Sequence, residues 1–162
     1  MFKYDRDDLI KQIAHHEGVV LEVYKDSLGF DTVGIGRNLE HRGIAELELA
    51  HMEKTMSEIY KDGITKEQAY FLADRDIEIA ERELVSSHSI VKKLDAVRQR
   101  VLVDMAFNMG IPRLSKFIRM WGAIDKQDYE SAAKEMQDSR WARQVKSRAD
   151  TLSYAMEYGQ FA

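Results

Sequence analysis

Hydrophobic and polar positions follow helical spacing at the start of the chain and strand spacing soon after it. Leu9, Ile10, Ile13 and Ala14 form one apolar stripe, typical of a helix that packs on a core. Asp5 can cap the first turn of this helix, and Gly18 ends it. The runs "VVLEVY" and "FDTVGIG" within residues 19–37, separated by the turn signal "KDSLG", predict a small antiparallel hairpin or meander.

The rest of the chain is predicted to be helical. An apolar stripe from Ile44 predicts one helix that ends at Gly63. Thr65 and Gln68 have the spacing of a capping box, and the long helix after them should run to about Val85. The segment "LDAVRQRVLVDMAFNMG" is apolar on almost every side, which predicts the central core helix. Further helices are expected at about 114–123, 128–137 and 141–156.

These elements predict an α+β fold that is mainly α. We expect a single domain over residues 1–162, which is an ordinary length for one domain. The expected organisation is a small antiparallel β lobe at 19–65 and a larger helical lobe made of 1–18 plus 66–162, joined by the long helix. A cleft between two lobes is where a ligand site is expected.

Composition and charge narrow the function classes. Hydrophobic residues make up 44% and charged residues 32%, there is one proline, and there is no cysteine, which excludes disulfides and thiolate chemistry. The net charge is −4, from 24 Lys/Arg against 28 Asp/Glu, and this acidity argues against a nucleic-acid-binding protein. A local basic run, "RWARQVKSR" from residue 140, is either a solvated helix face or a patch for an anionic ligand. The charged start and the lack of a long apolar run lead us to expect no signal peptide and no stable membrane insertion.

Glu17, Asp26 and Thr32 are the residues that could carry chemistry. Two carboxylates across a cleft are the minimum equipment for glycoside hydrolysis, in which one is a proton donor and the other attacks or aligns a water. The ordinary alternative is a Glu at a helix end, an Asp in a turn and a β-branched residue in a strand. His15 and His16 are adjacent and so point about 100° apart on a helix, and no other His adds ligand spacing, so we expect no metal and no cofactor.

Four collinear motifs resemble the phage-type lysozyme family. The first is a Glu at a helix end followed by "YKDSLGFDTVGIG", in which Asp26 lies nine residues after Glu17 and Thr32 six residues after Asp26. The others are "GITKEQA" at 63–69, "LDAVRQRVLVDMAFNMG" at 94–110 and "SRWARQVKSRA" at 139–149. Together they span nearly the whole chain, so the resemblance implies a lysozyme-like fold.

The resemblance implies a muramidase, which cleaves the β-1,4 bond between N-acetylmuramic acid and N-acetylglucosamine in peptidoglycan. By position, Glu17 would be the general acid, and Asp26 and Thr32 would orient the attacking water, with inversion at the anomeric carbon. Thr32 would suit this task because a hydroxyl both donates and accepts hydrogen bonds. Arg148 would orient Glu17.

The resemblance also implies residues that line the sugar site. These substrate-binding candidates are Asn38, Phe107, Asn108 and Glu135, while Trp141 is expected in the core. The family usually has a His after the "GIG" turn, paired with an Asp early in the long helix. This chain has Arg37 and Asp76 in these places, so an Arg37–Asp76 ion pair is expected, without the pH dependence that a His would bring.

The implied biological role is that of an endolysin of a bacteriophage, a bacteriolytic and antimicrobial enzyme for host cell lysis. We expect a monomer whose partner is peptidoglycan, made in the host cytoplasm and acting in the periplasm after a separate holin-type protein has permeabilised the membrane. Two alternatives stay open. One is a catalytically weak peptidoglycan-binding module of a virion, and the other is a lytic transglycosylase, which needs one acid and no residues that align a water.

Overall fold

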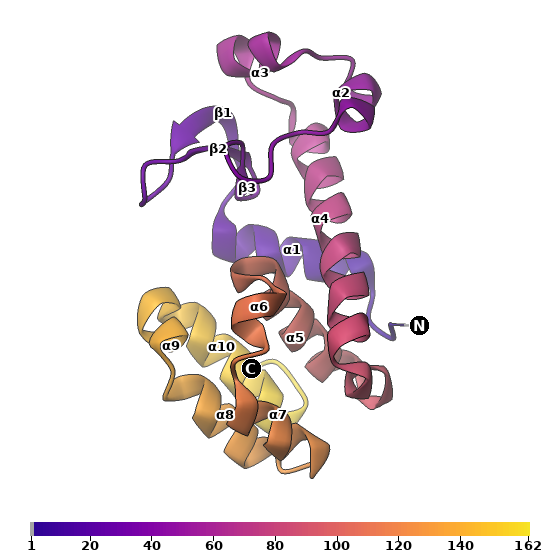
Figure 1. Ribbon diagram of the computed structural model, residues 1–162, viewed down its shortest axis with the longest axis vertical. Coiled ribbons are helices and arrows are strands. Elements are labelled where there is room, and N and C mark those ends of the chain that lie inside the picture. Colours follow the sequence, from indigo (N-terminus) through magenta and orange to yellow (C-terminus); the bar gives the residue numbers. More distant parts are fainter. Residues whose placement is uncertain (1) are drawn as a thin grey trace. The chain divides into compact units, whose positions relative to one another are not determined.

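The computed structural model describes residues 2–162, and the chain over this range forms a mainly helical α+β fold with a three-stranded antiparallel sheet (Figure 1). The predicted fold class is therefore confirmed. The chain divides into two compact units, which we name the β unit, Ile10–Asp76, and the helical unit, which comprises Ile77–Ala162 and the N-terminal residues up to Leu9. The elements of the β unit and those that lead into it are α1 (Arg6–Glu17), β1 (Val20–Lys25), β2 (Asp31–Gly34), β3 (Arg37–Asn38), α2 (Glu46–Met52), α3 (Met56–Asp62) and α4 (Lys66–Ser87).

The helical unit contains a 3₁₀ helix and the α-helices that follow α4. Their bounds are η1 (Ser89–Lys93), α5 (Ala96–Met109), α6 (Ile111–Leu114), α7 (Ile118–Asp125), α8 (Tyr129–Gln137), α9 (Arg140–Val145) and α10 (Ser147–Tyr158). Among the helices of residues 2–162, none is long and apolar enough to cross a membrane.

The β unit is built on the sheet, whose strand order is β1-β2-β3. Thr32 on the central strand lies opposite Tyr24 on β1 and opposite Asn38 on β3, while Val33 lies opposite Arg37. The core of this unit contains apolar side chains that are at most 2% exposed, namely Ile13, Val33, Ile35, Ile59, Ala69, Leu72 and Ala73. The predicted hairpin or meander is thus present.

The single helix predicted from Ile44 to Gly63 is wrong, because the structure has two short helices there. Glu53, after the end of α2, takes a left-handed φ of 55°, which interrupts the helix. Thr55 then starts α3 with a capping box: its Oγ1 accepts from Glu58 N at 3.1 Å, and its own N donates to Glu58 Oε1 at 3.1 Å. The capping box supplies hydrogen-bond partners for backbone N–H groups at the start of α3. The break between α2 and α3 therefore does not leave these groups without partners.

The long helix α4 begins as predicted. Gln68 N donates to Thr65 Oγ1 at 3.1 Å, and Thr65 N donates to Gln68 Oε1 at 2.9 Å. The helix continues two residues past the expected end at Val85. Its first part, up to Asp76, belongs to the β unit, and the rest belongs to the helical unit.

The helical unit is organised around α5. Asp95 caps this helix by accepting from Arg98 N at 3.0 Å. Its side chains Val101, Leu102, Val103 and Met105 are all 0% exposed, as expected of a central core helix. α10 packs on α8 and on α5.

Two of the shorter helices predicted in this unit are divided. The helix expected at 114–123 is replaced by α6 and α7, which lie on either side of residues 115–117. The helix expected at 141–156 is divided into α9 and α10 at Lys146, whose φ of 50° is incompatible with a continuous right-handed helix. The helix expected at 128–137 is present as α8.

The lobe boundaries expected at 19–65 and at 1–18 plus 66–162 stay a prediction. Residues 10–17 of α1 and the first part of α4 cluster with the sheet in the β unit, Ile10–Asp76. Ile13 and Leu72, which are 0% and 1% exposed, are among the apolar side chains that these two helices contribute to the β unit.

Candidate active site

Glu17 is the last residue of α1, and its side chain is half-buried. Gly18 N closes the helix with a hydrogen bond to Ala14 O at 2.8 Å, and its φ of 81° turns the chain into β1. The turn between β2 and β3 approaches the Glu17 carboxylate closely. A Cβ at Gly36 would stand 3.0 Å from Glu17 Oε1, so the lack of a side chain at Gly36 permits this approach.

Asp26 follows β1 directly and organises the turn to β2. Its Oδ1 accepts from Leu28 N and from Phe30 N, both at 2.9 Å. Its backbone N also donates to Phe30 O at 2.9 Å. Within residues 2–162, both hydrogen bonds to the carboxylate end on Oδ1, so Oδ2 can accept a hydrogen bond from a water or a substrate hydroxyl.

Thr32 lies on the central strand and is 3% exposed. Its Oγ1 donates to Phe30 O at 3.0 Å, which fixes the hydroxyl proton and leaves the oxygen as an acceptor. The turn residue Phe30 therefore contacts both Asp26 and Thr32 through its backbone. In this way the local hydrogen bonds fix the two residues relative to one another.

Tyr24 on β1 is a further residue of this region, and the sequence analysis missed it. Burial raises the pKa of the Tyr24 hydroxyl, and the negative charges of Glu17 and Asp26 raise it further. Tyr24 also lies opposite Thr32 on the neighbouring strand. The only available signal was that Tyr24 stands two residues before Asp26 in the quoted motif.

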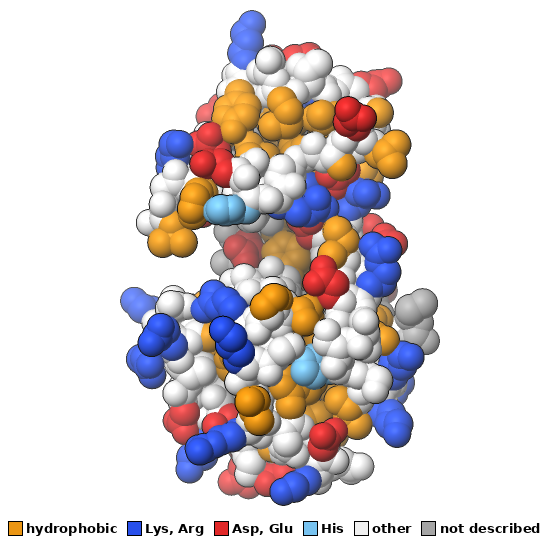
Figure 2. Space-filling view, in the orientation of Figure 1, with side chains coloured by type: hydrophobic (Ala, Val, Ile, Leu, Met, Phe, Trp, Pro, Cys, Tyr) orange, Lys and Arg blue, Asp and Glu red, His pale blue; other side chains and the backbone are white. Residues whose placement is uncertain are grey.

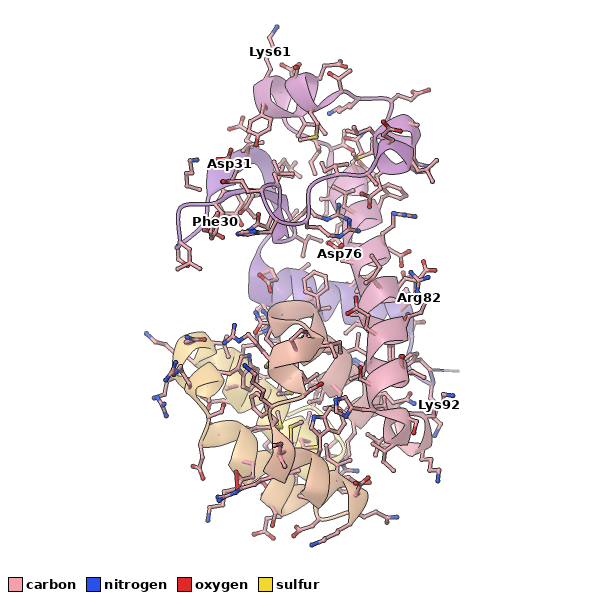
Figure 3. All side chains as sticks on the ribbon, viewed as in Figure 1. Phe30, Asp31, Lys61, Asp76, Arg82 and Lys92 are labelled. Carbon is pink, nitrogen blue, oxygen red and sulfur yellow. The ribbon has the colours of Figure 1, made fainter. Side chains whose placement is uncertain are left out.

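Asp31, next to Thr32, belongs to an exposed polar cluster at the start of β2 (Figure 3). It pairs with Lys25 Nζ at 2.6 Å and accepts from the Tyr60 hydroxyl at 2.9 Å. These two hydrogen bonds lower the pKa of Asp31. The carboxylate is thus fully engaged in holding β1, β2 and α3 together.

Asn38 was a candidate for substrate binding. The structure places it on β3 opposite Thr32, with its side chain half-buried. Its Oδ1 accepts from Glu40 N and from His41 N, both at 2.8 Å, so the oxygen caps the following turn. Only the Nδ2 donors of Asn38 are left for a sugar.

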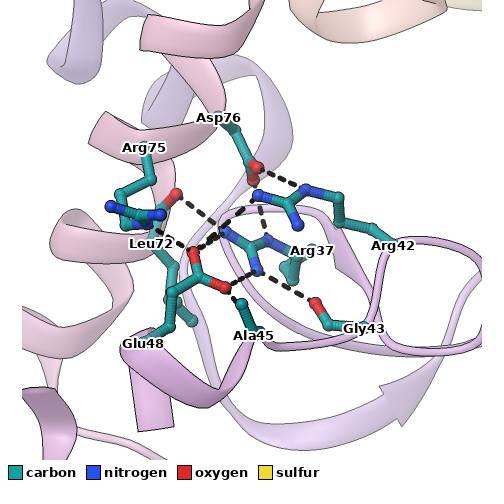
Figure 4. A network of polar contacts seen from close by, with 8 residues as sticks. All are labelled: Arg37, Arg42, Gly43, Ala45, Glu48, Leu72, Arg75 and Asp76. Atoms are coloured by element: carbon teal, nitrogen blue, oxygen red, sulfur yellow. Dashed lines mark hydrogen bonds and ion pairs between the residues drawn. The ribbon is translucent and has the colours of Figure 1, made fainter. Parts of the chain in front are cut away.

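The expected Arg37–Asp76 pair is present, within a larger cluster of ion pairs around the buried side chains of Arg37 and Glu48, which we name the Arg37 network (Figure 4). Its members are Arg37, Arg42, Glu48, Arg75 and Asp76. Arg37 Nε donates to Asp76 Oδ2 at 2.9 Å, and the guanidinium also binds both oxygens of Glu48 at 3.0 Å. The sequence analysis missed Glu48. Its position in the predicted helix relative to the apolar residues does not distinguish it from exposed Glu residues.

Burial would raise the pKa of Glu48, but hydrogen bonds from Arg37 and from Ala45 N outweigh it and hold the pKa at about 2. Burial would likewise lower the pKa of Arg37, and its bonds to Glu48 and Asp76 more than compensate. Both side chains therefore remain charged in the interior of the β unit, where each is at most 2% exposed.

In the helical unit, Asn108 and Trp141 form a bonded pair. Trp141 is 3% exposed, as expected of a core residue, and its Nε1 donates to Asn108 Oδ1 at 2.7 Å. The Phe117 ring meets the indole edge-on, with 6.3 Å between the ring centres. Phe107, the neighbour of Asn108 on α5, is half-buried. The amide of Asn108 is therefore oriented, with its Nδ2 donors available to a ligand.

Glu135, another candidate for substrate binding, lines a pocket of about 390 Å³ in the helical unit. The side chains of Lys116, Phe117 and Ser139 line the same pocket. An aromatic ring beside charged and hydroxyl groups suits a polar ligand with an apolar face, such as a sugar. Phe117, which contacts both this pocket and Trp141, was not a candidate from the sequence.

Arg148 is 6% exposed and pairs with Asp104, which is 0% exposed. Arg148 Nε and Nη2 lie 2.9 and 2.8 Å from Asp104 Oδ1. Asp104 was missed by the sequence analysis, because α5 is apolar around it and an Asp there gave no sign of its partner. The expected orientation of Glu17 by Arg148 joins residues of different units and stays a prediction.

Exposed cations gather over α9 and beside α6 (Figure 2). We name this surface the basic patch, and its members are Arg113, Lys116, Arg140, Arg143 and Lys146. Arg113 Nη2 donates to Gln144 Oε1 at 3.2 Å, which places α6 beside α9. Over residues 2–162, none of the five takes part in an ion pair. The basic run found in the sequence is thus part of a surface available to an anionic ligand.

Comparison with known proteins agrees with this arrangement. The sequence profile of the Phage lysozyme family matches residues 14–154. The chain is 30% identical over 158 residues to probable T4-type lysozyme 1 of Dictyostelium discoideum, covering 91% of this chain and 92% of that protein. It is 33% identical over 156 residues to the pre-baseplate central spike protein Gp5 of Enterobacteria phage T4, covering 90% of this chain and 27% of the larger protein.

The family profile covers the segments that carry Glu17, Asp26, Thr32, Asn108 and Arg148. A match of this length, together with a relative of similar size, concerns the whole fold and is more than a shared short motif. The chain therefore belongs to the phage lysozyme family of peptidoglycan-hydrolysing enzymes.

Proposed function

We propose that the protein is a muramidase that hydrolyses the β-1,4 bond between N-acetylmuramic acid and N-acetylglucosamine, with inversion at the anomeric carbon. Glu17 gives its proton to the leaving oxygen, and Asp26 and Thr32 align the attacking water. The observation that carries the proposal is the local geometry of the β unit: the backbone of Phe30 joins Asp26 to Thr32, and the Gly36 turn lies against the Glu17 carboxylate.

The hydrogen bonds of Asp26 and Thr32 support the division of roles. Asp26 Oδ1 is held by two backbone amides, while Oδ2 accepts no bond from the described residues and can bind a water. Thr32 Oγ1 donates to Phe30 O and so presents its lone pairs. A water between the two would donate one hydrogen to each, which turns its own lone pair toward the sugar.

The helical unit would hold the polymer. Asn108, oriented by Trp141, offers amide donors, and the pocket beside Phe117 and Glu135 offers an aromatic face with polar groups. The basic patch is complementary to the carboxylates of an anionic wall polymer. These contacts would supply binding energy away from the bond that breaks.

A turbidity assay on Gram-negative cells stripped of their outer membrane tests the proposal. The wild type should clear the suspension, while Glu17→Gln, which keeps the shape but has no acidic proton, should not. Clearing by both proteins, or by neither, would contradict the muramidase assignment. In the second case, retained binding to peptidoglycan would instead identify a virion-type binding module.

Analysis of the product ends separates hydrolysis from transglycosylation. Hydrolysis with inversion gives a new reducing end whose first anomer is opposite to that of the substrate, observable by NMR before mutarotation. An anhydro-sugar end would instead identify a lytic transglycosylase.

We further propose that the enzyme acts as an endolysin in host cell lysis. It would accumulate as a monomer in the host cytoplasm and reach the periplasm once a holin-type protein has opened the membrane. Expression in bacterial cells, with and without such a protein, tests this role: lysis should require both. Lysis by the enzyme alone would show that it crosses the cell membrane without a holin-type protein.

A further inference from the structure

The guanidinium of Arg37 uses all of its hydrogen-bond donors. Besides Nε to Asp76, Nη1 donates to Gly43 O at 2.9 Å and to Glu48 Oε1 at 3.0 Å. Nη2 donates to Glu48 Oε2 at 3.0 Å and to Leu72 O at 3.1 Å. An arginine has five N–H groups, and each has one partner here. The side chain thus connects β3 to α2, to α4 and to the loop at Gly43.

The hydrogen-bond acceptor sites of the Glu48 carboxylate are likewise all occupied. Its Oε1 accepts from Arg37 Nη1 and, at 2.8 Å, from Ala45 N. Its Oε2 accepts from Arg37 Nη2 and, at 2.9 Å, from Arg75 Nε. A carboxylate with about four acceptor sites, all engaged, can adopt only one position. Glu48 therefore fixes the plane of the Arg37 guanidinium, and not only its charge.

The backbone of Arg37 lies next to the candidate catalytic residues. It directly follows Gly36, the glycine that approaches Glu17 Oε1, and it pairs with Val33, the neighbour of Thr32. A displacement of Arg37 would move the Gly36 turn against the Glu17 carboxylate, and it would move Thr32 through the β2–β3 pairing. Every element in this chain of contacts belongs to the β unit.

We propose that Glu48 is a positioning residue of the active site, which acts through Arg37 to hold the Gly36 turn against Glu17 and Thr32 in register. This inference rests on the proposed muramidase function. The two hydrogen bonds from Arg37 to the Glu48 carboxylate fix the orientation of the guanidinium as well as its distance. The single hydrogen bond to Asp76 does not fix the orientation. A purely structural ion pair would require charge balance alone, whereas positioning requires the geometry of both oxygens.

Two variants of Glu48 separate charge from geometry. Glu48→Gln keeps the length of the side chain and removes the charge, while Glu48→Asp keeps the charge and shortens the side chain by one methylene. Both should lower kcat by about 10- to 100-fold with KM within twofold of wild type, since small displacements of reacting groups have effects of this size. Kinetics are measured on soluble peptidoglycan fragments at a temperature where circular dichroism shows each protein fully folded.

Ile59→Ala is the matched control. Ile59 is 0% exposed, lies in the same β unit on α3, and is not a member of the Arg37 network. This variant should lose thermal stability and keep kcat within twofold of wild type. If Glu48→Gln does not fold, Glu48→Asp decides, because it leaves no uncompensated buried arginine.

A wild-type kcat for folded Glu48→Asp, or a loss confined to KM, would overturn the positioning role. Loss of activity in Ile59→Ala equal to that in the Glu48 variants would also overturn it, because general destabilisation would then be sufficient. An inactive wild type would contradict the proposed function itself. An active wild type with an inactive Glu17→Gln and fully active Glu48 variants would contradict this inference alone.

Discussion

The indole of Trp141 and the amide of Asn108 are joined by a 2.7 Å hydrogen bond in which Trp141 Nε1 donates to Asn108 Oδ1. Because Trp141 is buried, this bond fixes the amide of Asn108 from the inside of the helical unit. The aromatic residue of the "SRWARQ" motif thus orients a polar residue of the "AFNMG" motif, although 32 residues separate them in the chain.

Trp141→Phe should therefore raise KM for peptidoglycan several-fold, because the amide of Asn108 is no longer oriented. The free energy of unfolding should fall by about 1–3 kcal/mol, as the half-buried amide oxygen of Asn108 loses its partner. Trp121→Phe is the control, since Trp121 is also buried and its Nε1 donates to Leu114 O at 3.0 Å. It should show a similar loss of stability with an unchanged KM. Equal KM values for the two variants would contradict the role given to Asn108.

The low pKa of Glu48 predicts that the protein loses stability in acid. Its pKa of about 2 in the folded state lies below the value of about 4.3 of an unfolded chain. The folded state therefore binds fewer protons between these values, so its stability is complete above about pH 4.5 and is lost as the pH falls toward 2. The shift corresponds to about 3 kcal/mol.

Urea unfolding of the wild type and of Glu48→Gln between pH 2 and 7 measures this contribution. The difference between the two free energies of unfolding should shrink as the pH falls through the window from 4.5 to 2. A difference that does not change with pH would mean that Glu48 does not titrate as described.

The environment of His88 predicts a second and smaller dependence of the stability on pH. It stacks on Trp121 with 3.8 Å between ring centres and shares a 2.9 Å hydrogen bond with Ser115 Oγ. Burial lowers the pKa of His88, with a smaller opposing effect of Asp125. Because the unfolded state then binds the proton more readily, stability should decrease as the pH falls below about 6.5. His88→Phe, which keeps a stacked ring, should have a flatter profile of melting temperature from pH 7 to 5.

The sequence was sufficient to predict features that depend on near neighbours. Turn and capping signals are local in the sequence. They identified the N-cap at Asp5, the capping box of Thr65 and Gln68, and the hairpin in which β1 pairs with β2. The second box, at Thr55 and Glu58, was overlooked because an apolar stripe of helical spacing continues across it. The pattern of apolar positions records which side is buried, but it does not record a left-handed residue such as Glu53.

The candidate site was predicted less completely. Glu17, Asp26 and Thr32 became candidates through the spacing of a family motif and stay a prediction, while the Arg37–Asp76 pair was expected from a departure from that motif and is present. Glu48 and Asp104 were not found, because a buried carboxylate has the same one-letter code as an exposed one and its partner is set by the fold. Residues that act through a second residue carry no signal of their own in one sequence.

The basic patch predicts how activity depends on salt. Exposed charges are screened over about 10 Å at 0.1 M ionic strength, so added salt should weaken their attraction for an anionic wall. Arg140→Gln with Arg143→Gln should lower the clearing rate about 3- to 10-fold at low salt and have little effect at high salt. Lys61→Gln, an exposed cation of the β unit on α3, is the control and should match the wild type at every salt concentration. Parallel salt profiles for all three proteins would remove the patch from substrate binding.

Gly36 offers the most direct test of the geometry around Glu17. Its φ is 71°, and an added Cβ would stand 3.0 Å from Glu17 Oε1. Gly36→Ala should therefore displace either the turn or the carboxylate, and kcat should fall by 100-fold or more while the protein stays folded. Gly122→Ala is the control, because Gly122 lies within α7 and an added Cβ there meets no atom within 4 Å. It should gain roughly 0.5–1 kcal/mol of stability, as a helical Gly is replaced by Ala, with wild-type kcat. Activity in Gly36→Ala equal to that of Gly122→Ala would show that the close approach of the turn to Glu17 is not needed for the reaction.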